Sequence, residues 1–99
     1  MLWKVNFSAE ADSQLLKLDK QDRERIRKYV KDLETLPDPR MRGESLTGNL
    51  SDFWKYRVGK YRLICRLQDD QLLVLIVKIG KRDKVYKHRG GLLGFHQHK

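Results

Sequence analysis

The chain has 99 residues, of which 22 are lysine or arginine and 13 are aspartate or glutamate, so its formal net charge is +9 at pH 7. This length leaves room for one core only, and we expect a single domain over residues 1–99. The charge predicts an anionic partner, nucleic acid first and an acidic protein second, while a surface charged for solubility is the other explanation.

The chain contains one cysteine, Cys65, within an apolar stretch. A disulfide framework is therefore excluded, and we expect a buried thiol in a reducing compartment. The longest apolar run, residues 72–77, is too short to span a bilayer, and the N-terminus lacks the pattern of a signal peptide. These features predict a cytoplasmic protein with no membrane partner.

The first half of the chain predicts a strand and two helices. Apolar and polar residues alternate over residues 2–7, which is the period of a half-buried strand. Ser8 is a good N-cap for a short helix, and Asp19 can cap a second helix that ends at Pro37. The apolar stripe of this second helix consists of Ile26, Tyr29, Val30 and Leu33. A short connection makes the two helices an antiparallel hairpin.

The second half predicts a loop and three strands. Residues 37–51 contain two prolines and two glycines and are typical of a loop. Strands are expected over residues 53–58, 61–68 and 72–79, with tight connections at residues 59–60 and 69–70. The expected fold class is α+β, an antiparallel β-sheet with an N-terminal helical hairpin packed on one face, in the order β-α-α-β-β-β.

The turn at Gly59 and Lys60 fixes the register of the first hairpin, because a two-residue loop makes Val58 face Tyr61 and places Arg57 opposite Arg62. Side chains alternate between faces, so one face is apolar and the other is cationic. The apolar face carries Trp54, Tyr56, Val58, Tyr61, Leu63 and Cys65. The cationic face carries Lys55, Arg57, Arg62 and Arg66.

Opposed like charges destabilise a sheet, and neither strand of this hairpin carries a carboxylate to offset them. A bound phosphate would neutralise the cations, although a solvated basic face is the alternative interpretation. A second basic segment follows the last predicted strand, and its candidate RNA contacts are Lys81, Arg82, Lys84 and Tyr86. In a meander this segment leaves beside the neighbouring strand, so Arg82 and Tyr86 are expected near Arg62. A solvated tail is the other explanation.

These residue types favour metal-independent cleavage of RNA. The three histidines lie in the last dozen residues without ligand spacing, and the sequence has no phosphate-binding glycine loop and no nucleophile elbow. We therefore expect neither a metal nor a cofactor. RNA can be cut by its own 2′-hydroxyl where cations stabilise the phosphorane and nearby groups accept and donate protons.

Each cation has a candidate role in such a reaction. Lys55 and Arg57 would stabilise the phosphate oxygens, and Arg62 would hold the scissile phosphate through two hydrogen bonds. Arg82 would lie beside the leaving 5′-oxygen, and Tyr86 would stack on a base or take a proton. Further RNA or phosphate contacts are expected from Arg66, Lys81 and Lys84.

The order and spacing of these segments resemble the RelE/ParE toxin superfamily over nearly the whole chain. The resemblance lies in residues 46–48, the segment Phe-Trp-Lys-Tyr-Arg at 53–57, Tyr-Arg-Leu-Ile at 61–64, the acidic turn at 69–70, and residues 79–86. The RelE branch implies a toxin that enters the ribosomal A site, next to the 16S rRNA, and cuts translated mRNA. It also implies a cognate antitoxin whose acidic or amphipathic segment covers the basic face or the helical hairpin.

The resemblance also implies roles for single residues. The lysine pair of the RelE branch falls on Lys55 and Arg57, its phosphate-binding arginine on Arg62, its general-acid arginine on Arg82, and its aromatic on Tyr86. Because Arg57 replaces the second lysine and stays protonated, the general base must lie elsewhere.

Glu44 is the alternative base. Residues 44–48 and 51–54 also resemble the YoeB branch, in which a glutamate at this position is the base. An ordinary loop carboxylate is the other interpretation of Glu44. The competing function is that of the ParE branch, which inhibits DNA gyrase by protein contact, and an RNA-binding module without activity is a third.

Overall fold

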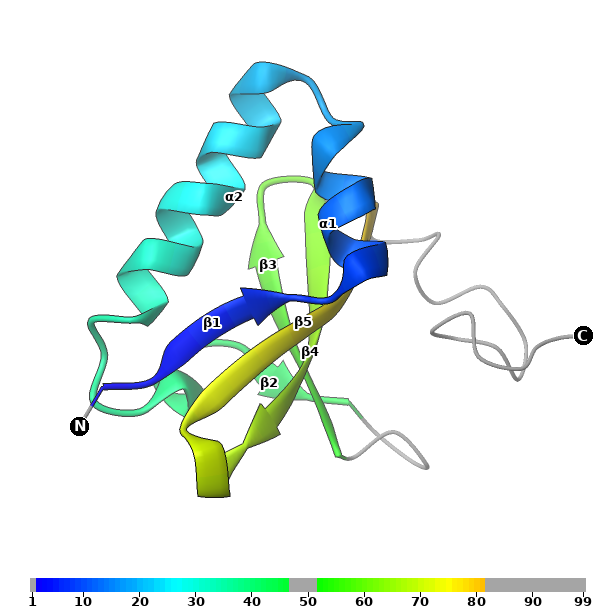
Figure 1. Cartoon of the computed structure of the whole chain (residues 1–99). Helices are drawn as coiled ribbons and strands as arrows, with labels where there is room; N and C mark the ends of the chain where they lie inside the picture. Colours follow the sequence, from blue (N-terminus) through cyan, green and yellow to red (C-terminus); the bar gives the residue numbers. More distant parts are fainter. Residues whose placement is uncertain (1, 47–51, 82–99) are drawn as a thin grey trace, which may run out of the picture.

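The computed structural model describes residues 2–46 and 52–81. Within them, two helices lie over one face of a five-stranded sheet (Figure 1). The elements in chain order are β1 (Lys4–Phe7), α1 (Ala9–Leu16), α2 (Lys20–Leu33), η1 (Pro39–Met41), β2 (Glu44–Ser45), β3 (Phe53–Val58), β4 (Tyr61–Gln68), η3 (Asp69–Gln71) and β5 (Leu73–Lys81). The predicted α+β class and the order β-α-α-β-β-β are confirmed, with β2 as an additional short strand.

Both predicted helix starts are confirmed by their capping hydrogen bonds. The Ser8 hydroxyl oxygen accepts a hydrogen bond of 3.1 Å from the backbone N–H of Ala11, and an Asp19 carboxylate oxygen accepts one of 2.9 Å from that of Asp22. Such caps satisfy backbone donors that the first helical turn leaves unpaired. The first residues of both helices could therefore be predicted from the local sequence.

The sheet has the strand order β1-β5-β4-β3-β2 and is mixed. Strands β2 to β5 pair antiparallel, as predicted, but β1 pairs parallel with β5, with Val5 opposite Val74. The expectation of a wholly antiparallel sheet was wrong for β1. No turn joins these two strands, so the direction of their pairing depends on how the helical hairpin carries the chain across the sheet.

Two predicted boundaries also differ from the structure. The segment 37–51, expected to be a loop, contains η1 and β2 in its described part. The predicted two-residue connection at residues 69–70 is longer, because η3 occupies it and Leu72 follows with φ +49°. This left-handed conformation ends the turn, so β5 begins at Leu73 and extends to Lys81.

The core lies between the helices and one face of the sheet. Its fully buried members include Ala11, Leu15, Ile26, Leu33, Tyr56, Leu63, Cys65, Val74 and Ile76. The predicted apolar face of β3 and β4 therefore packs under the helices, and Cys65 is a buried free thiol as expected. Within the described ranges, no helix is long and apolar enough to cross a membrane.

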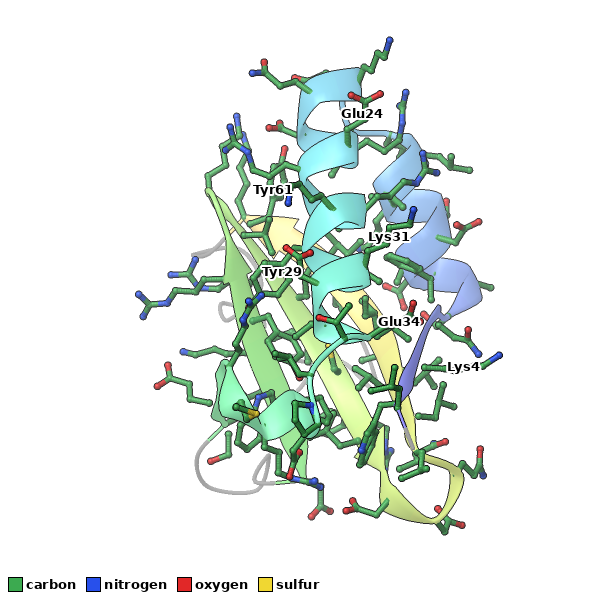
Figure 2. All side chains as sticks on the ribbon, turned by 90° about the vertical axis from the view of Figure 1, so that its left-hand side faces the viewer. Lys4, Glu24, Tyr29, Lys31, Glu34 and Tyr61 are labelled. Atoms are coloured by element: carbon green, nitrogen blue, oxygen red, sulfur yellow. The ribbon has the colours of Figure 1, made fainter. Side chains whose placement is uncertain are left out.

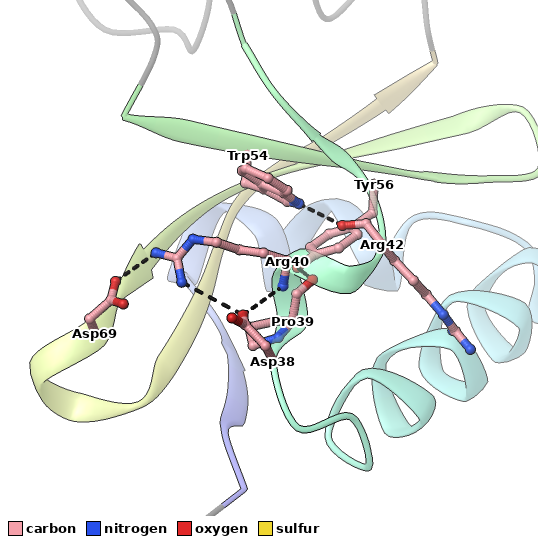
Figure 3. Close-up of polar contacts among 7 residues, drawn as sticks. All are labelled: Asp38, Pro39, Arg40, Arg42, Trp54, Tyr56 and Asp69. Atoms are coloured by element: carbon pink, nitrogen blue, oxygen red, sulfur yellow. Dashed lines mark hydrogen bonds and ion pairs between the residues drawn. The ribbon is translucent and has the colours of Figure 1, made fainter.

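The segment around η1 is fixed to the sheet by hydrogen bonds and an ion pair (Figure 3). The Tyr56 hydroxyl donates to the Pro39 carbonyl at 2.9 Å, and the Trp54 indole N–H donates to the Arg42 carbonyl at 2.8 Å. The Arg40 guanidinium lies 2.6 Å from an Asp69 carboxylate oxygen. These contacts determine where the chain passes on to β2.

Candidate functional site

The predicted register of the hairpin is confirmed, with Val58 opposite Tyr61 and Arg57 opposite Arg62. Direct cross-strand partners share a face, so both guanidinium groups lie on the side of the sheet away from the helices. Here "the cationic face" denotes Lys55, Arg57, Arg62 and Arg66. The structure therefore brings the central arginine pair together as the sequence predicted.

Arg62 is buried, with 6% of its surface exposed. Its Nε is buried and forms no hydrogen bond in the described part of the chain. The residue opposite Arg62 on β5 is Gly80, which adds no side chain to this face. A buried N–H of a guanidinium without an acceptor is costly, and an anionic ligand that accepts a hydrogen bond from it would remove that cost.

Lys55 forms an ion pair with Glu44, the residue directly opposite it on β2, at 3.1 Å. The two strands of the hairpin carry no carboxylate, as the sequence indicated, but β2 supplies one to the cationic face. The hydrogen bond and the charge of Lys55 lower the pKa of Glu44, and the charges of Arg57 and Arg62 lower it further. Glu44 therefore carries a negative charge at neutral pH among three cations.

A pocket of about 320 Å³ opens at this edge of the sheet. We call it "the edge pocket", and it is lined by Tyr29, Gly43, Glu44, Lys55 and Arg57. It joins α2, β2 and β3, and Figure 2 shows Tyr29 between α2 and the sheet. An acid, two cations and a phenol thus meet in one small concavity beside Arg62.

Arg66 lies on the cationic face but farther along β4. It is four residues from Arg62, which corresponds to about 13 Å along a strand. Its guanidinium lies 5.1 Å from the centre of the Phe53 ring, and it lines a second cavity of about 620 Å³ at the other end of the sheet. Arg40, which lines the same cavity, is already paired with Asp69.

The segment after β5 is described only up to Lys81. This residue is the cross-strand partner of Tyr61, so it lies on the helix side of the sheet and not with Arg62. The remaining candidates, Arg82, Lys84 and Tyr86, lie outside the described residues.

The structure adds residues that the sequence did not indicate as functional. Tyr29 was expected only as part of the apolar stripe of α2, but it is half-buried and its ring is flanked on one side by the Arg42 guanidinium at 5.5 Å. The Tyr56 ring lies at 5.8 Å from it. The sequence signal that could have pointed to Tyr29 is its polar hydroxyl, because the rest of the stripe is aliphatic.

Comparisons with known proteins identify the family of this chain. The family model for the ParE toxin of type II toxin-antitoxin systems matches residues 5–86. The chain is 29% identical over 86 residues to the mRNA interferase toxin RelE of Escherichia coli K12, covering 85% of this chain and 87% of that protein.

Solved structures with the same fold include the Mycobacterium tuberculosis toxin-antitoxin complex RelBE2, with a TM-score of 0.74, 26% identity and coverage of 83% of this chain and 93% of that one. A mutant of the E. coli toxin RelE in the free state matches with a TM-score of 0.70, 25% identity and coverage of 84% and 86%. The archaeal RelE–RelB complex of Pyrococcus horikoshii matches with a TM-score of 0.65 and 26% identity. The match covers 83% of this chain and 97% of that one. The chain therefore belongs to the RelE/ParE superfamily of toxins of type II toxin-antitoxin systems.

Proposed function

We propose that this RelE-like toxin is a ribosome-dependent endoribonuclease that cuts translated mRNA in the A site without a metal ion. The observation that carries the proposal is the buried, unpartnered Nε of Arg62, directly opposite Arg57 and close to the Glu44–Lys55 ion pair. A phosphodiester would supply an acceptor for the Arg62 Nε and an anion for the arginine pair. The curated relative in E. coli, named an mRNA interferase, supports the same assignment.

In the proposed reaction the 2′-hydroxyl of the RNA is the nucleophile. Its oxygen bonds to the neighbouring phosphorus while the bond from phosphorus to the 5′-oxygen breaks, so the products end in a 2′,3′-cyclic phosphate and a 5′-hydroxyl. Lys55, Arg57 and Arg62 hold the phosphate oxygens as negative charge develops on them. The balance requires a group that takes the 2′ proton and one that supplies a proton to the 5′-oxygen.

We assign the first of these roles to Glu44 and the second to Arg82. Glu44 is the carboxylate that β2 places beside Lys55, at 3.1 Å, and its lowered pKa keeps it in the ionised form that a base requires. Arg57 is permanently protonated and stabilises charge only. The roles of Arg82 and of Tyr86 as a base-stacking group rest on the resemblance to the RelE branch.

The proposed partners are mRNA, the ribosome with its 16S rRNA, and a cognate antitoxin. Structures of RelE-type toxins in complex with RelB antitoxins support the last of these. A net charge of +9 favours an acidic antitoxin and steers association with RNA. We therefore propose that the toxin acts in the cytoplasm.

The ParE-type function, inhibition of DNA gyrase by protein contact, is the second candidate. The match to the ParE toxin family model supports it at the level of the family only. The two functions predict different targets, because a gyrase inhibitor has no need of an unpartnered cation at a phosphate site.

One experiment separates the two functions. The toxin is induced in cells that carry a reporter transcript, with and without its start codon, and the 5′ ends of the transcript are mapped. We expect new ends only in the translated transcript, with gyrase supercoiling unaffected. Intact transcripts together with inhibited supercoiling would assign the ParE function instead. New 5′ ends that appear equally in both transcripts would show that cutting does not require the ribosome, and would contradict that part of the proposal.

A further inference from the structure

We propose that the edge pocket receives one nucleobase of the RNA beside the scissile phosphate, and that Tyr29 determines which base is preferred. This inference deepens the proposed nuclease function and rests on it. It names a binding site for a base on the β3 edge, separate from the aromatic stacking assigned to Tyr86.

The argument starts from the backbone of β3. The Leu46 N–H donates to the Phe53 carbonyl at 3.1 Å, so the backbone groups of Phe53 point toward β2. Backbone groups along a strand point to the same side at every second residue, so those of Lys55 and Arg57 also point toward the β2 side. Glu44, the first residue of β2, pairs with Lys55, and the pairing between β2 and β3 extends no further toward Arg57. Arg57 is thus the next residue whose N–H and carbonyl face the outer edge.

No neighbouring strand reaches these two groups of Arg57 in the described part of the chain. The residue that would oppose Arg57 is Arg42, whose N–H donates to the Pro39 carbonyl and whose carbonyl accepts from the Trp54 indole. Gly43 then turns the chain with φ +76°. Among residues 2–46 and 52–81, the N–H and carbonyl of Arg57 therefore have no strand partner, and they form a donor and an acceptor side by side on a residue that lines the edge pocket.

The open stretch of edge is too short for a peptide. Val58 directs its backbone groups toward β4, and the turn at Gly59 follows at once. One residue with outward groups offers a single pair of hydrogen bonds, whereas strand addition uses several. A nucleobase needs only such a pair, because its Watson–Crick edge carries a donor and an acceptor next to each other.

The rest of the pocket fits a base attached to a phosphate. Its volume of about 320 Å³ lies at the small end of the range of about 300–1,000 Å³ for small-molecule pockets. Lys55 and Arg57 provide cations for the adjoining phosphate. Tyr29 forms the opposite wall, and its ring is held in place by Arg42 and Tyr56. Its hydroxyl, which lies within hydrogen-bonding reach of Arg42, is a neutral polar group that can distinguish one base edge from another, beside the charged Glu44.

Gly43, which lines this pocket, lies very close to β3. A Cβ at this position would lie 2.4 Å from the Lys55 carbonyl oxygen and 2.8 Å from Cδ1 of Tyr56. The chain therefore passes closer to β3 than a residue with a side chain allows, and backbone instead of side chain forms this wall.

The test uses Tyr29→Phe, which keeps the ring and removes the hydroxyl. Its matched control is Tyr61→Phe, which removes a hydroxyl that lies 3.3 Å from Asp22 on the helix side. Cutting by wild type and both variants is mapped over a translated transcript that contains all codons. We expect Tyr29→Phe to change the relative cutting rates at different bases about two- to tenfold, the effect of one hydrogen bond. Tyr61→Phe should leave the profile unchanged.

A binding measurement separates this inference from the proposed function. The backbone N–H signals of ¹⁵N-labelled protein are recorded by NMR while inorganic phosphate or each of the four 3′-mononucleotides is added. We expect the Arg57 signal to shift with at least one nucleotide and not with phosphate alone, and Tyr29→Phe to weaken that binding.

Each outcome has one meaning. An unchanged cutting profile in Tyr29→Phe, or a uniform loss at all bases, would overturn the inference, as would an Arg57 signal that responds only to phosphate. Weaker antitoxin binding with an unchanged profile would assign the pocket to a protein partner and would overturn it too. If the wild type cuts no RNA but nucleotides still shift Arg57, the base site stands and the nuclease function falls.

Discussion

Arg57 and Arg62 are direct cross-strand partners in β3 and β4, yet Arg57 is exposed while Arg62 retains only 6% of its exposure. Two guanidinium groups at this spacing repel each other, and the Nε of the buried one has no hydrogen-bond partner within residues 2–46 and 52–81. The pair therefore lowers the stability of the free protein. Such unfavourable arrangements are common at binding sites, where a charged ligand offsets them.

Replacing Arg62 by alanine should lower the rate of mRNA cutting about 100- to 1,000-fold, the cost of one oxyanion-stabilising group. The melting temperature should stay the same or rise, because a repulsive contact is removed. Arg62→Lys should recover part of the activity, since it keeps the charge and loses the forked geometry. Arg27→Ala, an exposed arginine on α2, is the matched control and should cut normally. Normal cutting by Arg62→Ala would contradict the proposed phosphate site.

Replacing Glu44 by glutamine tests its assignment as the general base. Removing a general base lowers a rate about 100- to 10,000-fold, and we expect a single-turnover cutting rate reduced within that range. The measurement compares wild type and Glu44→Gln on the same programmed ribosomes. A rate that rises, because Lys55 is released from its ion pair, would show that Glu44 only restrains Lys55.

The pH dependence gives a second test of the same residue. Lys55 holds the pKa of Glu44 below its ordinary value of 4.5, so the carboxylate stays ionised at every pH above that value. A base with a lowered pKa loses activity only when the pH falls through that low value. The ratio of the wild-type rate to the Glu44→Gln rate should therefore be constant between about pH 5.5 and 7.5. A ratio that falls within this interval would identify a different base.

Gly43→Ala should destabilise the fold by about 2–5 kcal/mol, because it combines a left-handed residue with a side chain that meets the backbone of β3. Gly59→Ala is the matched comparison. Its φ is +59°, but the nearest atom to a new Cβ is the end of the mobile Arg25 side chain, so the cost should be about 1–2 kcal/mol. Urea unfolding of both variants measures the difference, and equal losses would show that Gly43 is not tightly packed.

Glu34→Ala should destabilise the fold by about 1–3 kcal/mol. A Glu34 carboxylate oxygen accepts a 2.8 Å hydrogen bond from the Val5 N–H, which faces away from β5 at the outer edge of the sheet. This bond ties β1 to the end of α2, and its loss leaves a half-buried donor unpaired. Glu34→Gln keeps an acceptor and should lose less. Hydrogen exchange at Val5 that is unchanged in Glu34→Ala would contradict this role.

Local sequence determined the parts of this protein that depend on neighbouring residues. The caps Ser8 and Asp19, the alternation along β3 and β4, and the turn at Gly59 fixed the helices and the register that opposes Arg57 and Arg62. These features depend on hydrogen bonds and side-chain periods within a few residues, so they can be read in order along the chain.

Contacts between distant residues were decided only by the tertiary structure. No local signal predicted the parallel pairing of β1 with β5 or the short strand that brings Glu44 to Lys55. The same is true of the buried Arg62 Nε, which has no hydrogen-bond partner among the described residues. The same holds for Tyr29, whose position at the edge of the sheet turns a residue of an apolar stripe into the wall of a pocket. Such pairings depend on how the helical hairpin and the η1 segment fold back over the sheet, and no stretch of a few residues encodes that path.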